Sequence, residues 1–239
     1  MSVKDRIILA LDVNEKDYAL EIVDRFGDSV DIFKVGLELF VSAGPSVVEE
    51  IQKRGKRVFL DLKFHDIPNT MSMAGQAAAR LGVFMFNVHA SAGYEAMRRV
   101  SGDVTSLCLK ENLPRPWILG VTVLTSIGAE ELKNEFGIQH SLKTHVRHLS
   151  GLALKAGLDG VVASGQEIAM IKGHCGDKFL IAAPGIRPSW TPPDDQKRTM
   201  TPKQAIHEGA DFIVLGRAVL RQPDPIKALE LISLDIMTA

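Results

Sequence analysis

Short apolar runs recur along the whole chain and predict the strands of a parallel sheet. The runs are rich in Val, Ile, Leu and Phe, which is typical of strands that are buried on both faces. The predicted strands are Arg6–Val13, Asp31–Gly36, Arg57–Phe64, Val83–Ala90, Trp117–Leu124, Gly160–Ala163, Phe179–Ala183 and Asp211–Leu215.

Helical periodicity fills most of the intervals between these strands. The predicted helices are Lys16–Phe26, Pro45–Arg54, Pro68–Leu81, a short one within Gly128–Phe136, His145–Ala156 and Thr201–His207. Two segments depart from this rhythm. Ser101–Pro116 is predicted to be a long connection, and the polar, proline-rich Arg187–Arg198 follows the seventh strand. A connection as long as the second is usually functional.

Eight strands that alternate with helices in 239 residues predict an α/β protein with a single (β/α)8 barrel, the TIM-barrel fold. We expect residues 1–239 to form one catalytic domain. A doubly wound open sheet is the alternative. It usually has fewer strands, and no G-x-G-x-x-G turn follows the first strand here.

Composition narrows the class of protein. A net charge of −1 argues against a whole-chain electrostatic grip on nucleic acid or an anionic membrane. No segment approaches the roughly 18 apolar residues of a membrane helix, and no signal-peptide pattern is evident. Two cysteines, Cys108 and Cys175, are too few for a disulfide framework or a four-cysteine zinc site. We therefore expect a cytoplasmic enzyme with reduced thiols.

Charged residues interrupt the apolar strands at positions that face the barrel axis. Asp61 and Lys63 alternate with apolar neighbours on the third strand, so both point inward. Lys34 on the second strand and Asp12 at the end of the first follow the same rule. Buried charges must pair or serve a function, and catalytic groups of barrels lie at the carboxyl ends of strands. This cluster, with Asp66 just beyond it, predicts an active site.

The fourth strand also places polar side chains inward, at Asn87 and His89. His89 is open to two interpretations, an interior polar filler or a partner of the charged cluster.

The last two strands end in a second pattern, which favours phosphate binding. Pro184-Gly185-Ile186-Arg187 closes the seventh strand, and Gly216-Arg217 follows the eighth. Barrels commonly bind phosphate in these two loops. Glycine lets backbone N–H groups approach the anion, and arginine binds it bidentately.

The ten residues from Asp61 to Thr70, D-L-K-F-H-D-I-P-N-T, resemble the signature of the orotidine 5′-phosphate decarboxylase family. The resemblance extends in order over essentially the whole chain. Its further motifs are L-A-L-D ending at Asp12, F-K-V-G around Lys34, V-T-V-L-T-S ending at Ser126, P-G-I-R ending at Arg187 and L-G-R ending at Arg217.

The resemblance implies catalytic roles. Lys63 would protonate C6 of the pyrimidine as carbon dioxide leaves, within a charged network of Lys34, Asp61, Lys63 and Asp66. Asp66, Ile67 and Thr70 would reach the neighbouring subunit's site in a homodimer. The expected product is uridine 5′-monophosphate, at the last step of its de novo synthesis, with no metal or organic cofactor.

The resemblance also implies substrate contacts. The expected substrate-binding residues are Asp12 and Lys34 at the ribose, Asp61, Ile67 and Thr70 in the signature, Thr125 and Ser126 by the base, and Pro184, Arg187, Gln196, Gly216 and Arg217 around the phosphate.

The chemistry agrees with these roles, because decarboxylation leaves a carbanion that needs nearby positive charge and then a proton. Carboxylates beside Lys63 favour its ammonium form, which argues against a Schiff-base aldolase. Two alternatives stay open. A metal-dependent sugar-phosphate decarboxylase or synthase of the same superfamily would carry an acidic residue at Lys34. A non-catalytic phosphate- or nucleotide-binding barrel would not need Lys63.

Overall fold

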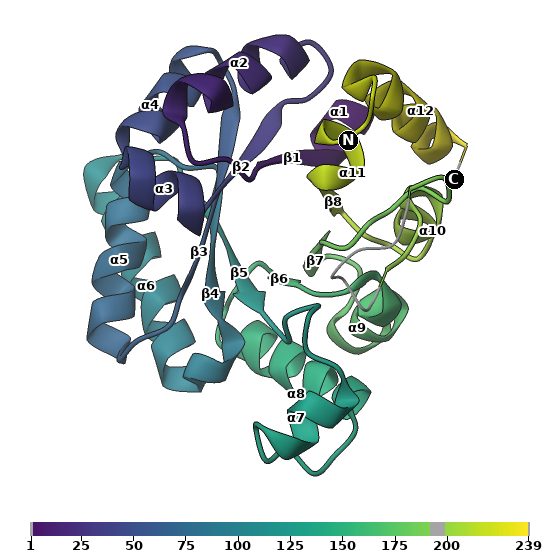
Figure 1. Cartoon of the computed structure of the whole chain (residues 1–239). Helices are drawn as coiled ribbons and strands as arrows, with labels where there is room; N and C mark the ends of the chain where they lie inside the picture. The colour runs from purple at the N-terminus through teal and green to yellow at the C-terminus, as the bar shows by residue number, and fades with distance from the viewer. Residues whose placement is uncertain (1, 192–198, 239) are drawn as a thin grey trace.

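The computed structural model describes residues 2–191 and 199–238, in which eight parallel strands close into a barrel in chain order (Figure 1). The strands are β1 (Ile7–Leu11), β2 (Ile32–Gly36), β3 (Arg57–Phe64), β4 (Met85–His89), β5 (Trp117–Val121), β6 (Gly160–Val162), β7 (Leu180–Ala183) and β8 (Phe212–Leu215). Pairing of β1 with β8, for example Ile8 opposite Val214, closes the barrel. The predicted (β/α)8 fold is confirmed.

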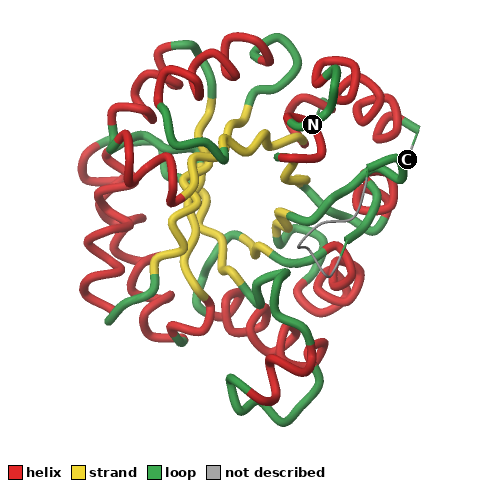
Figure 2. The backbone as a smooth tube through the Cα atoms, in the orientation of Figure 1, coloured by secondary structure: helices red, strands yellow, loops and turns green. Residues whose placement is uncertain are grey.

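Helices surround the barrel, as Figure 2 shows in red around the yellow strands. Those of the first half are α1 (Val3–Arg6), α2 (Lys16–Phe26), α3 (Leu37–Ala43), α4 (Ser46–Lys53), α5 (Pro68–Arg80), η1 (Ala90–Ala92) and α6 (Tyr94–Glu111). Those of the second half are α7 (Ala129–Asn134), α8 (Leu142–Lys155), η2 (Gly165–Glu167), α9 (Ile168–Cys175), α10 (Pro202–His207), α11 (Arg217–Leu220) and α12 (Pro225–Met237). None of the described helices is long and apolar enough to cross a membrane.

The prediction of a long connection at Ser101–Pro116 is wrong, because α6 continues to Glu111. Ala96, Val100, Val104 and Leu107 recur at helical spacing and are all buried. This apolar stripe packs α6 onto the barrel and outweighs the polar residues between its members.

Alternate strand residues face the helices or the barrel axis. On β2, Phe33 and Val35 join the large core between strands and helices, whereas Ile32 joins the inner core. Lys34 shares the inward direction of Ile32 but lies nearer the carboxyl end of the strand. The period of two residues thus carries Lys34 into the barrel.

Aromatic side chains fill the amino end of the barrel. The rings of Phe84 and Trp117 lie 4.8 Å apart between centroids, and those of Trp117 and Phe212 lie 5.7 Å apart. The Arg57 guanidinium covers the Phe84 ring at 4.5 Å and pairs with Asp5 at 2.6 Å. With this end packed, the open space of the barrel lies at the carboxyl ends of the strands.

Candidate active site at the carboxyl end of the barrel

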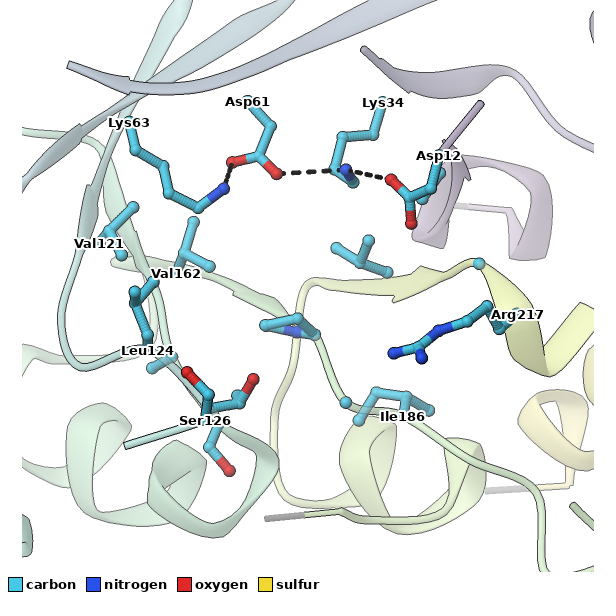
Figure 3. A pocket seen from close by; sticks show the side chains of 18 of the residues that line it. Asp12, Lys34, Asp61, Lys63, Val121, Leu124, Ser126, Val162, Ile186 and Arg217 are labelled. Atoms are coloured by element: carbon cyan, nitrogen blue, oxygen red, sulfur yellow. Dashed lines mark hydrogen bonds and ion pairs between the residues drawn. The ribbon is translucent and has the colours of Figure 1, made fainter. Parts of the chain in front are cut away.

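A cavity of about 320 Å³ opens at the carboxyl ends of the strands. The cavity is lined by most of the site residues that were predicted to act within their own chain. Figure 3 shows how several of them face one another across it. They are Asp12, Lys34, Asp61, Lys63, Thr125, Ser126, Pro184, Arg187, Gly216 and Arg217.

Four charged side chains form one continuous row along a wall of this cavity (Figure 3). The Lys34 Nζ lies 3.0 Å from Asp12 Oδ1 and 3.3 Å from Asp61 Oδ2. The Lys63 Nζ lies 2.8 Å from Asp61 Oδ1. Carboxylate and ammonium groups therefore alternate from β1 across β2 to β3, as the inward-facing positions predicted.

Burial and charge oppose each other in the middle of the row. The side chains of Lys34 and Asp61 are only 11% and 12% exposed. Burial alone would raise the pKa of Asp61, but Lys34, Lys63 and a hydrogen bond from Asn87 lower that pKa below its usual value. Burial would likewise lower the pKa of Lys34, but Asp61 and Asp12 raise it. Both groups are held in their charged forms.

The backbone at Lys63 is unusual. Its φ of 52° lies in the left-handed region, which costs a residue other than glycine about 1–3 kcal/mol. The β3–β4 register shifts at the same place, between Leu60 and Phe64. Asn87 accepts a hydrogen bond from the Lys63 backbone N–H at 2.8 Å and donates one to Asp61 Oδ1 at 2.6 Å. A side chain of the neighbouring strand β4 therefore stabilises the left-handed backbone of Lys63.

Sequence reasoning placed Asn87 inside the barrel but gave it no role. The signal was its inward direction on β4, opposite the apolar Phe86 and Val88. Its partners follow from the register shift in β3, which residue periodicity does not reveal.

His89 is half-buried and lies beside the charged row. Its ring centroid is 5.2 Å from that of His65. Burial, and then the nearby His65 and Lys63, lower the pKa of His89. A neutral His89 at neutral pH is consistent with either of its two interpretations.

The loops after β7 and β8 approach the other side of the cavity. Pro184, Gly185 and Arg187 come from the first loop, and Gly216 and Arg217 from the second. A Cβ atom at Gly216 would lie 3.1 Å from the Asp12 carboxylate, so glycine brings this backbone close to the charged row. Figure 3 shows the Arg217 guanidinium extending into the cavity opposite Asp61 and Lys34.

The β5 loop adds hydroxyl groups. Thr125 and Ser126 line the cavity after β5, and Ser126 lies across it from the charged row (Figure 3).

Three signature residues lie outside the cavity. Asp66, Ile67 and Thr70 are exposed where β3 leads into α5, and the Asp66 carboxylate accepts the Ile67 N–H at 2.6 Å. The chain therefore does not bring Asp66 into its own charged row. Gln196 lies outside the described residues.

A closed parallel barrel with convergent charged side chains at its carboxyl end is the architecture of a (β/α)8 enzyme. The chain belongs to the Orotidine 5′-phosphate decarboxylase / HUMPS family, whose model matches residues 5–232.

Similar proteins span nearly the full chain. The orotidine 5′-phosphate decarboxylase of Syntrophomonas wolfei is 49% identical, over 95% of this chain and 96% of that protein. That of Moorella thermoacetica is 46% identical, over 99% and 94%. The crystal structure of the orotidine 5′-phosphate decarboxylase from Lactobacillus acidophilus matches with a TM-score of 0.85 and 35% identity, covering 97% of this chain and 99% of that one.

Proposed function

We propose that this chain decarboxylates orotidine 5′-monophosphate to uridine 5′-monophosphate, the last step of de novo synthesis of that nucleotide. The observation that carries the proposal is the row Asp12–Lys34–Asp61–Lys63 in the cavity of a barrel whose relatives bear the decarboxylase name. The row supplies fixed positive charge beside a group that can donate a proton, which a carbanionic reaction requires.

Lys63 is the proton donor in this reaction. As the bond between C6 and the carboxylate breaks, its electron pair stays on C6 and carbon dioxide leaves. The Lys63 ammonium then gives one proton to C6. Asp61, 2.8 Å from that ammonium, holds it in place before transfer.

The remaining cavity residues bind the substrate. Asp12 and Lys34 contact the ribose, and Thr125 and Ser126 contact the base. The phosphate-binding residues are Pro184, Arg187, Gln196, Gly216 and Arg217. Support comes from the position of the described members on the β5, β7 and β8 loops around one cavity. Phosphate binding far from the reacting carbon can contribute to catalysis by assembling the site.

The reaction proceeds without a metal or organic cofactor. Asp12 and Asp61 are the carboxylates that a divalent cation would use at this end of the barrel, and the Lys34 ammonium lies between them at 3.0 and 3.3 Å. A cation there would be repelled by Lys34. This favours decarboxylation over the metal-dependent alternative.

The active form is a homodimer in the cytoplasm, with Asp66, Ile67 and Thr70 of each chain completing the partner's site. Large apolar residues are exposed near this segment, on helices that follow the adjacent strands β2 and β3. They are Leu37 and Val41 on α3 and Met73 on α5. Contiguous exposed apolar side chains mark a surface for association, and Leu37 and Val41 lie one helical turn apart on α3. Two free thiols, Cys108 and Cys175, support the reducing compartment.

The test is a spectrophotometric assay with orotidine 5′-monophosphate on the wild-type protein, Lys63→Ala and Lys53→Ala. We expect wild-type turnover that excess EDTA leaves unchanged. Lys63→Ala should lower kcat by at least about 10²–10⁴-fold, because the proton donor is lost. Lys53, which pairs with Glu50 on the exposed face of α4, is the matched control and should keep full activity.

Two outcomes would contradict the proposal. A requirement for magnesium would favour the metal-dependent alternative. Binding of uridine 5′-monophosphate without any turnover would favour the non-catalytic barrel.

A further inference from the structure

The strand β3 contains extra residues, relative to β4, in the segment that carries Asp61 and Lys63, and this changes the hydrogen bonding there. Leu60 pairs with Phe86 and Phe64 pairs with Val88, so the three residues Asp61 to Lys63 lie opposite the single residue Asn87. A bulge of this kind leaves backbone groups without their ladder partners.

The side chain of Asn87 replaces the missing ladder bond. Its Oδ1 accepts the Lys63 backbone N–H at 2.8 Å, and its Nδ2 donates to Asp61 Oδ1 at 2.6 Å. Asn87 is fully buried, so both bonds form away from water. An amide supplies one acceptor and one donor on a short side chain, and this pair of partners needs both.

The two hydrogen bonds of Asn87 constrain Lys63 and Asp61, whose ammonium and carboxylate groups contact each other. One fixes the backbone of Lys63, which holds a left-handed φ of 52° without being glycine. The other fixes the same Asp61 oxygen that contacts the Lys63 ammonium at 2.8 Å. The amide therefore ties both ends of the Lys63 residue, its backbone directly and its ammonium through Asp61.

We propose that Asn87 is a positioning residue for the reaction, which orients the Lys63 ammonium and the Asp61 carboxylate for proton transfer. This inference rests on the proposed function of Lys63 as proton donor. Residues that hydrogen-bond and orient a metal-ligating side chain typically contribute about 10- to 100-fold to activity, and we expect a loss of the same size for Asn87.

The experiment compares Asn87→Ala, Asn87→Asp and the wild-type protein. Asn87→Ala removes both hydrogen bonds. Asn87→Asp keeps the size and the acceptor for the Lys63 N–H but places a second carboxylate beside Asp61, where it competes for the Lys63 ammonium. We expect kcat to fall about 10- to 100-fold in each, while the affinity for uridine 5′-monophosphate, measured by titration, stays at the wild-type level.

The pH profile separates positioning from a general loss of stability. Asp61 faces Lys34 from β2, Lys63 from β3, and Asn87 and His89 from β4, while Asp12 pairs with Lys34 behind it. Of these groups around Asp61, Asn87→Ala removes only the amide that donates a hydrogen bond to the carboxylate. The pKa of Asp61 should rise, and the acid limb of the kcat profile should move to higher pH.

The control is Ser101→Ala, which removes a tertiary hydrogen bond from α6 to the Gly157 carbonyl just after α8, where neither residue lines the cavity. It should lower the thermal midpoint without changing kcat or the acid limb. If Asn87→Ala does not fold, the isosteric Asn87→Asp decides.

Wild-type kcat and pH profile in a folded Asn87→Asp or Asn87→Ala would overturn the inference, provided that Lys63→Ala is inactive in the same assay. Absence of turnover in the wild-type protein would instead contradict the proposed function itself.

Discussion

Asp61 contacts both lysines of the charged row, so the charge balance of the site depends on it. A carboxylate with two ammonium partners and an amide donor can remain ionised in a buried place. Removal of its charge leaves Lys34 with Asp12 alone, and the Asp12 side chain is 52% exposed.

We expect Asp61→Asn to lower the free energy of unfolding by about 3–5 kcal/mol at pH 7, since it breaks a buried ion pair. The pKa of Asp61 is lowered on folding from 3.8, so its contribution is fully present above pH 3.8. It is lost as the pH falls through the lower, folded value. Urea unfolding of both proteins between pH 7 and 3 measures this. A difference that shrinks already at pH 6 would contradict this assignment.

The residue types and their spacing predicted which side chains form the charged row, but they did not predict the backbone geometry at Lys63. The period of two residues on β3 correctly predicted that Asp61 and Lys63 face inward. Nothing in a lysine signals the left-handed backbone found at Lys63, because that conformation lies at a register shift where Asn87 of the next strand accepts the Lys63 N–H. The position of Asp66 could not be tested within one chain. Asp66 is predicted to reach the site of a neighbouring subunit, and in the single chain it is exposed.

At the scale of elements, apolar runs located all eight strands because a strand buried on both faces has little room for polar residues. The predicted first and last residues of the helices were less accurate than the predicted strands. α8 begins at Leu142 rather than His145, since the Ser141 side chain accepts the Thr144 N–H at 3.2 Å and caps the helix there. The error in α6 has a different origin, because Ser101 and Gly102 lie inside a helix that tertiary packing stabilises.

Two glycines show how packing decides the effect of the same substitution. A Cβ at Gly160 on β6 would overlap the Leu180 carbonyl oxygen on β7, whereas one at Gly102 on α6 meets nothing within 4 Å. We expect Gly160→Ala to destabilise the protein by about 1–3 kcal/mol through overpacking. Gly102→Ala should stabilise it by about 0.5–1 kcal/mol through helix propensity. Thermal unfolding measures both, and equal shifts would contradict the packing at β6.

At the scale of the whole molecule, the charged residues of the segment Asp61–Thr70 lie in two places, the cavity and the exposed surface. Asp61 and Lys63 line the cavity, while Asp66, only three residues beyond Lys63, is exposed. A second chain can use that surface, and the proposed homodimer gives Asp66 a site to complete.

A mixing experiment tests this arrangement. In a mixed dimer of Lys63→Ala and Asp66→Ala chains, one site has Lys63 from one chain and Asp66 from the other. Each variant alone should be nearly inactive. In an equimolar mixture with random pairing, half of the dimers are mixed and each of these has one intact site of two, so the mixture should recover about a quarter of wild-type activity.

A mixture of Lys63→Ala with Arg217→Ala is the control. Both residues line the cavity of their own chain, so neither site of a mixed dimer is intact and no recovery is expected. Absence of recovery with Asp66→Ala in verified mixed dimers, or a monomer by sedimentation, would exclude the shared site.

The aromatic packing at the amino end has an optical consequence. The chain has two tryptophans. Trp117 begins β5 at the amino end of the barrel, whereas Trp190 lies in the loop that follows the carboxyl end of β7. Trp117 lies among Phe84 and Phe212 at the packed end, away from the cavity. Trp190 follows β7 beyond Arg187 and is 47% exposed. Their fluorescence therefore reports on different events. Emission from Trp190 is expected to change when the loop after β7 changes its surroundings. Emission from Trp117 is expected to change only when the packed end of the barrel unfolds.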